Sequence, residues 1–120
     1  MRDLGWREKA LERITELLRL EPGWDSYQGK AISFPIAWFT LLMLETIMES
    51  RTPEPFIMPS GEGFLQVEWH IGDTDIELYV IGPCRVEAYR SKSGIEESHE
   101  ADVDMAIVRQ WLSELNLDHR

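Results

Sequence analysis

Three stretches between Leu65 and Tyr89 alternate between apolar and polar residues. A period of two is typical of β-strands with one buried and one exposed face, because successive side chains of a strand point to opposite sides. The segments between the stretches, Gly72-Asp73-Thr74 and Gly82-Pro83, contain residues that turns favour. Three strands joined by short turns form an antiparallel meander. We therefore predict a sheet whose apolar face packs on helices and whose polar face is solvated or covered by a partner.

Helical patterns lie on both sides of this sheet segment. Apolar residues recur at three- and four-residue spacing in residues 3–20 and in residues 102–116, where Val103, Ile107 and Trp111 belong to the predicted buried stripe. Asp102 and Asp104 suit the positively polarised N-terminal end of that last helix. A further helix is predicted from about Ser33–Pro35 to Ser50, with Ser33 as its cap.

Two further segments are ambiguous. Residues 56–58 lie among Pro53, Pro55 and Pro59, which allow an edge strand or an extended lead-in. Residues 91–100 are polar apart from Ile95 and predict a loop or a weak edge strand. The predicted fold class is therefore α+β: a single domain, residues 1–120, with an antiparallel three- to four-stranded meander packed on one face by two to three helices.

The predicted helix over residues 33–50 is apolar in every direction, which is typical of a helix that is buried on all sides. Its apolar run from Phe34 to Leu44, which already contains Pro35 and Thr40, is too short for a membrane span, which needs about 20 residues. We expect this helix to be central, between a sheet and another helix, or to be partly covered by a second subunit.

Composition narrows the class of protein. The chain has 120 residues, one cysteine and a net charge of −10, and its acid excess peaks in residues 63–104. One thiol forms no internal disulfide and no four-ligand zinc site. The N-terminus begins with charged residues and lacks a signal-peptide pattern, so we expect a cytoplasmic protein. An acidic domain repels phosphate backbones, so direct nucleic-acid binding is not expected, whereas a basic protein partner is favoured.

One group of polar residues could carry chemistry. Glu68 and His70 lie on one predicted strand, and Asp75 and Glu77 lie on its hairpin partner, so the four side chains should meet across the strands. Carboxylates beside an imidazole can bind a metal or act as acid and base. Their spacing matches no defined metal signature, and such residues are common on solvated sheet faces. We predict no metal and no cofactor, and the chain shows neither a nucleophile elbow nor a phosphate-binding loop.

The loop Gly23-Trp24-Asp25-Ser26-Tyr27 is unusually aromatic for a connection. One interpretation is a recognition loop. The other, which we favour, is architectural: Gly23 supplies a special backbone conformation, Asp25 caps backbone N–H groups, and the rings of Trp24 and Tyr27 cover the edge of the core.

This loop and the segment Pro59-Ser60-Gly61-Glu62-Gly63 before the strand Leu65-Gln66-Val67-Glu68-Trp69 resemble motifs of a family of short bacterial proteins of unassigned function. That family has a Gly-Trp-Asp-Ser/Gly-Tyr loop and a Pro-x-x-Gly-Gly turn before a strand ending in Glu-Trp. Here Glu62 interrupts the Gly-Gly pair. The resemblance covers about residues 20–80; it implies a bacterial context and no activity.

These observations leave three functions open. The first is a small protein-binding module, such as an antitoxin, an immunity protein or a regulator, which meets a basic partner. The second is a small metal-dependent or acid–base enzyme that uses the polar sheet face, and the third is a structural homodimer built on the apolar surface of residues 34–48. The candidate partner-binding residues are Trp24, Asp25, Tyr27, Tyr79, Glu87 and Tyr89.

Overall fold

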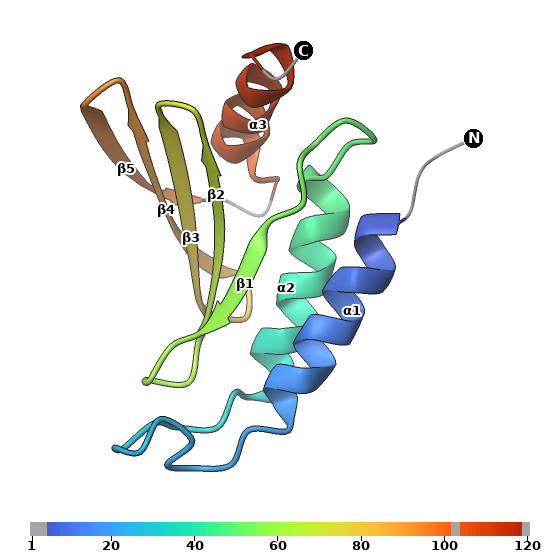
Figure 1. The fold of residues 1–120 in the computed structure, drawn as a ribbon, viewed down its shortest axis with the longest axis vertical. Helices are drawn as coiled ribbons and strands as arrows, with labels where there is room; N and C mark the ends of the chain where they lie inside the picture. The colour runs from blue at the N-terminus through green and yellow to red at the C-terminus, as the bar shows by residue number, and fades with distance from the viewer. Residues whose placement is uncertain (1–4, 102–103, 119–120) are drawn as a thin grey trace.

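The computed structural model describes residues 5–101 and 104–118 and shows an α+β fold (Figure 1). A five-stranded antiparallel sheet has the order β1-β2-β3-β4-β5, so each strand pairs with its neighbours in the sequence. The predicted meander is therefore confirmed, with five strands rather than three to four. The elements in chain order are α1 (Gly5–Leu18), α2 (Phe34–Ile47), β1 (Phe56–Pro59), β2 (Leu65–Ile71), β3 (Thr74–Gly82), β4 (Arg85–Lys92), β5 (Ile95–Ala101) and α3 (Ala106–Asp118).

Both ambiguous segments are edge strands. β1 pairs with β2, and β5 pairs with β4 from Lys92 opposite Ile95 to Val86 opposite Ala101. The β2–β3 turn is one residue shorter than predicted, because Thr74 already pairs with Ile71. This tight turn places His70 directly opposite Asp75 and Glu68 directly opposite Glu77.

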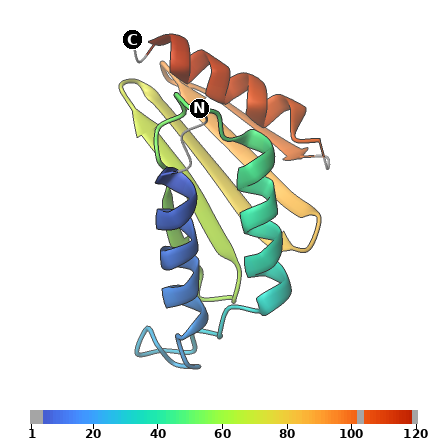
Figure 2. The same ribbon diagram turned by 90° about the vertical axis from the view of Figure 1, so that its right-hand side faces the viewer.

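All three helices lie on the same face of the sheet (Figure 2). α1 and α2 run antiparallel to one another over the sheet, and α3 crosses the part formed by β4 and β5. The alternating apolar residues Leu65, Val67 and Trp69 of β2 and Ile76, Leu78 and Val80 of β3 face these helices and are buried. The core includes Leu65, Val67, Trp69, Ile76, Leu78 and Val80 from the strands and Ile14, Leu17, Leu44, Ile47, Val108 and Leu112 from the helices.

The predicted start of α2 is confirmed. The Ser33 side chain accepts a hydrogen bond from the Ile36 backbone N–H at 3.4 Å, and Pro35 lies in the first turn. Of the two expected arrangements, complete burial within the chain is wrong, because one side of α2 is exposed in the single chain, and coverage by a second subunit stays a prediction. The sheet-facing side of α2 is buried, but Phe34, Trp38 and Leu42 are exposed.

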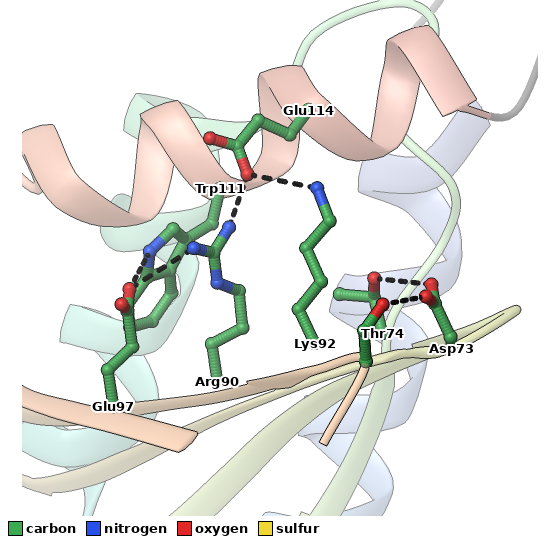
Figure 3. A network of polar contacts seen from close by, with 8 residues as sticks. Asp73, Thr74, Arg90, Lys92, Glu97, Trp111 and Glu114 are labelled. Carbon is green, nitrogen blue, oxygen red and sulfur yellow. Dashed lines mark hydrogen bonds and ion pairs between the residues drawn. The ribbon is translucent and has the colours of Figure 1, made fainter. Parts of the chain in front are cut away.

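α3 is attached to the sheet by a polar cluster around Arg90 (Figure 3). Arg90 lies on the helix-covered side of β4, and its guanidinium contacts Glu114 of α3 and, at 3.3 Å, Glu97 of β5. Trp111 stacks against the same guanidinium, 5.2 Å from ring centre to Cζ, and donates its indole N–H to Glu97 at 2.8 Å. A half-buried cation between two carboxylates and an indole thus replaces the apolar contacts found elsewhere under the helices.

α3 begins at Ala106, about four residues later than predicted, and the role expected of Asp104 is confirmed. Asp104 accepts a hydrogen bond from the Ala106 backbone N–H at 3.2 Å, as a residue near the start of a helix should. The corresponding predictions for Asp102 and Val103 fall outside the described residues.

Replacement of Arg90 by alanine should lower the free energy of unfolding by about 2–3 kcal/mol, because Glu97 and Glu114 lose the cation that they share, and Lys92 at 3.6 Å remains for Glu114 alone. Urea unfolding monitored by circular dichroism measures this. Arg85→Ala is the matched control, since Arg85 is an exposed residue of the same strand. Equal stabilities of the two variants would contradict a role for the Arg90 cluster in holding α3.

Candidate functional site

No described element covers the second face of the sheet, which we call the open face (Figure 1). The strand residues that alternate toward this face are mainly polar, and six of them are acids. The acids are Glu68, Asp75, Glu77, Glu87, Glu96 and Glu100. His70 and Arg85 are the basic side chains among the described strand residues on this side. The open face is therefore strongly acidic.

The predicted meeting of Glu68, His70 and Asp75 occurs. His70 Nδ1 lies 2.7 Å from Asp75 Oδ1 across the hairpin, and His70 Nε2 lies 2.8 Å from Glu68 Oε1 two residues earlier on β2. Glu77 lies opposite Glu68 in the register, but its carboxylate accepts a hydrogen bond from Tyr79 instead. The structure thus brings three of the four candidate residues into one hydrogen-bonded cluster.

Glu68 is buried although it belongs to the polar face. It is 6% exposed, and its register partner on β1 is Phe56, whose ring lies 6.5 Å from the His70 ring. The aromatic ring beside the cluster accounts for part of this shielding. A buried carboxylate needs a partner, because desolvation of an unpaired charge is costly, and His70 provides it.

The two carboxylates keep the pKa of His70 above its usual value. The hydrogen bond to Asp75 is the largest cause and the one to Glu68 is the second, while partial burial acts in the opposite direction. A neutral imidazole has one N–H and can donate to one carboxylate, whereas the protonated ring donates to both. The geometry therefore favours an imidazolium whose two N–H groups are already engaged, which leaves no ring lone pair for a substrate proton.

Metal binding receives no geometric support from the described residues: among them, no group of three or more His, Cys, Asp or Glu side chains is arranged to hold a metal ion. The chemistry that the cluster displays is charge pairing within a hairpin.

The open face is hollowed where β3, β4 and β5 lie side by side. A shallow depression of about 440 Å³ is lined by Glu77, Tyr79, Glu87, Tyr89, Ser98 and Glu100, together with Ala88 and His99. Both tyrosine hydroxyls donate to carboxylates: Tyr79 to Glu77 at 3.2 Å, and Tyr89 to Glu96 at 2.7 Å. Burial, with the Glu77 charge as the second cause, raises the pKa of Tyr79 to about 12. The candidate partner-binding residues Tyr79, Glu87 and Tyr89 thus surround one depression.

The register places acids directly against acids on this face. Glu68 lies opposite Glu77 on β2 and β3, and Glu87 lies opposite Glu100 on β4 and β5. Like charges that face each other across antiparallel strands destabilise the pair. His70 contacts one member of the first pair, whereas Glu87 and Glu100 are both exposed at the rim of the depression. Glu87 and Glu100 therefore repel each other at this rim.

The remaining candidates, Trp24, Asp25 and Tyr27, lie in the loop between α1 and α2 and do not join the depression (Figure 1). The architectural interpretation is confirmed for Gly23, which has a φ of +84°. It is also confirmed for Asp25, because its Oδ1 accepts hydrogen bonds from the backbone N–H groups of Tyr27 at 3.0 Å and Gly29 at 2.9 Å. Trp24 donates its indole N–H to the Lys30 carbonyl at 2.9 Å. Tyr27 does not cover the core edge, because its side chain is 85% exposed.

The two motifs that carry the resemblance contact one another. The Lys30 backbone N–H, just after the aromatic loop, donates to the Gly61 carbonyl in the turn before β2 at 3.0 Å. Gly63 in the same turn has φ +92°, and a Cβ there would come within 3.1 Å of the Ala31 carbonyl oxygen. The glycines of these motifs therefore let two chain segments approach closely, which explains them without a ligand.

Sequence reasoning missed two features of the open face. Phe56 beside His70 was not singled out, since prolines made the existence of β1 uncertain. The opposition of Glu87 and Glu100 depends on the register of β5, which has no apolar alternation to reveal it. The acidic composition of residues 96–100 was the available signal.

Comparison of the chain with protein-family models, with curated proteins and with solved structures finds no significant match. The resemblance to a bacterial family therefore stays an expectation based on the quoted motifs. Among the described helices, none combines the length and the apolar character that crossing a bilayer requires.

The His70 cluster should make stability depend on pH. A raised pKa in the folded state means that the stabilisation is fully present below the unfolded value of about 6.5 and is lost as the pH rises through the folded pKa. The stability of the wild type relative to His70→Gln should therefore be greatest at about pH 5.5 and decline toward about pH 8.5. Urea unfolding of both proteins across this pH range measures the difference, and an NMR titration follows the protonation of His70. If the difference in unfolding free energy between the two proteins does not change with pH, the His70 cluster does not stabilise the fold as described.

Replacement of Gly29 by alanine should destabilise the aromatic loop. A Cβ at this position would lie 2.6 Å from Asp25 Oδ1, so the carboxylate must move and lose its two backbone hydrogen bonds. We expect a loss of about 1–3 kcal/mol in unfolding free energy. Gly82→Ala is the control, because the added methyl group meets its nearest atom at 3.8 Å. If both alanine variants unfold at the same urea concentration, Asp25 does not hold the loop.

Proposed function

We propose that this chain is a small protein-binding module that docks a basic partner on its open face. The observation that carries the proposal is the direct opposition of Glu87 and Glu100 at the rim of the depression. Two exposed carboxylates in register repel each other in the free domain, and Lys or Arg side chains of a partner would convert this repulsion into attraction.

The tyrosines support the same surface. Tyr79 and Tyr89 present rigid rings in the depression, and tyrosine is enriched among the residues that dominate binding energy at protein interfaces. Their hydroxyls are oriented by Glu77 and Glu96, so docking would order few additional rotamers. An apolar or aromatic residue of the partner between two basic ones would match this depression.

An antitoxin, an immunity protein or a regulator would use such a surface, because each of these recognises a specific protein without chemistry of its own. The strong acid excess would also accelerate encounter with a basic partner at low ionic strength.

The enzymatic alternative has less support. It requires Glu68, His70, Asp75 or Glu77 to exchange a proton or to bind a metal. Both ring nitrogens of His70 are already hydrogen-bonded to carboxylates, Glu68 is buried beneath the cluster, and Glu77 accepts from Tyr79. These contacts account for the residues as structural pairs on a sheet face.

The proposal predicts opposite effects of one substitution on stability and on binding. Glu87→Gln should raise the urea midpoint of the free protein slightly, by a few tenths of a kcal/mol, because the repulsion with Glu100 is removed. The same substitution should weaken partner binding several-fold and reduce its dependence on salt. A tagged chain, used as bait in an extract of the organism that encodes it at low and moderate salt, supplies the partner; calorimetry with the purified partner gives the affinities.

Glu12→Gln serves as the control, since Glu12 is an exposed acid of α1 on the opposite side of the molecule. Glu12→Gln removes the same charge from the chain, and we expect it to leave both the urea midpoint of the free protein and its affinity for the partner nearly unchanged. If Glu87→Gln and Glu12→Gln weaken binding equally, the net charge and not the open face recruits the partner, and the proposed docking site is wrong.

A further inference from the structure

The outward side of the helix layer carries an apolar stripe that does not belong to the core. Phe34, Trp38 and Leu42 follow one another at four-residue spacing along α2, and they are 66%, 54% and 42% exposed. Leu11 of α1 is also exposed. From this stripe we infer that α1 and α2 form the interface of a symmetric homodimer, independently of the function proposed for the open face.

The ion pair between the helices fixes where Leu11 lies. Arg7 of α1 contacts Glu45 of α2 at 2.7 Å. Leu11 is one turn further along α1, and Leu42 is about one turn before Glu45 on α2. Because the helices run antiparallel, both steps lead the same way from the ion pair (Figure 2). Leu11 is therefore level with Leu42, and the stripe widens into a patch across both helices.

Two threonines extend this patch without adding polar groups that need water. Thr15 donates its hydroxyl to the Leu11 carbonyl at 2.7 Å, and Thr46 donates to the Leu42 carbonyl at 3.1 Å. Each hydroxyl donor is thus satisfied within its own helix, so burial against another surface would leave it paired.

The charge distribution favours a second copy of this chain as the occupant. α1 carries three acids and three bases, and the single charged residue of α2, Glu45, is paired with Arg7. Two such faces meet almost without net repulsion, although the whole chain has a net charge of −10. Two open faces, each with six acids, could not meet in this way.

The stripe is also complementary to itself. Its three side chains span about 12 Å along the helix axis, with Trp38 at the centre. A two-fold axis beside Trp38 sets Phe34 of one protomer against Leu42 of the partner subunit, and the reverse, as an isologous interface requires. The long aromatic at one end of the stripe then faces the shorter aliphatic at the other.

The exposed area is consistent with the centre of a dimer interface. The four apolar side chains expose on the order of 400 Å², if a complete aromatic side chain contributes about 150–250 Å². That value equals a typical largest apolar patch on a monomer, which is often functional. About 800 Å² per partner forms a standard interface, so the two threonines and the surrounding polar residues of α1 and α2 would form the rim.

Sedimentation equilibrium of the full chain tests this inference with two matched variants. Phe34→Glu places a charge in the stripe, whereas Phe56→Glu places the same charge on the open face, at a residue that is 63% exposed. Phe34 is the first residue of α2, where a glutamate suits the helix N-terminus, so the fold should persist in this variant. Trp38→Glu is a second stripe variant, and circular dichroism checks that each protein is folded.

We expect a wild-type dimer with a dissociation constant below about 100 µM, weakened at least tenfold by each stripe variant and unchanged by Phe56→Glu. A wild-type chain that stays monomeric over this concentration range overturns the inference. So does a dimer that keeps its affinity in either folded stripe variant, or one that Phe56→Glu dissociates.

Discussion

The apolar side chains of β2 and β3 must be kept from water, and every other element is arranged around that requirement. Leu65, Val67 and Trp69 lie against Ile76, Leu78 and Val80 in one register, so the sheet has a single face to cover. Three helices cover it from the same side. As a consequence the opposite face remains without a layer of its own, and its composition is free to serve another purpose. The division between an acidic sheet surface and a nearly neutral helix surface follows from this one-sided packing.

A one-sided sheet also has two edges, and the chain protects them differently. At β1 the Arg13 guanidinium donates to the Ile57 carbonyl at 2.8 Å, and prolines on both sides limit the strand to four residues. At β5 protection comes from charge, since Glu96, Glu97 and Glu100 would repel a second copy of the same strand. Edge-to-edge association of two chains is thus disfavoured at both ends of the sheet, which leaves faces, not edges, for contacts with other molecules.

The sequence predicted those parts of the fold whose local pattern agrees with their burial. Alternation in residues 65–89 and the Gly72-Asp73 turn defined the hairpin, and with it the meeting of His70 with Asp75. β5 lacks the apolar alternation that defined the other strands, because its side toward α3 carries the polar residues Glu97 and His99. Glu97 contacts Arg90 and His99 contacts the Trp111 ring, so neither belongs to the apolar core. The neighbour of Glu68 on β1 is Phe56, which comes beside it only after β1 pairs with β2. For α2, the sequence showed more apolar residues than one buried side needs, but it did not show which of them would be exposed in the single chain.

The five tryptophans are distributed so that each reports on a different part of this arrangement. Trp69 donates its indole N–H to the Pro53 carbonyl at the entrance of β1, Trp111 lies beside the Arg90 guanidinium, and Trp24 closes the loop between α1 and α2. Trp6 belongs to α1 and is buried, while Trp38 of α2 is exposed in the single chain. In the single chain, the intrinsic fluorescence therefore combines four buried or half-buried tryptophans with Trp38, which a dissolved quencher can reach only while the outer side of α2 is uncovered. Quenching by a dissolved reagent therefore reports whether the outer side of α2 is open or covered, without any added label.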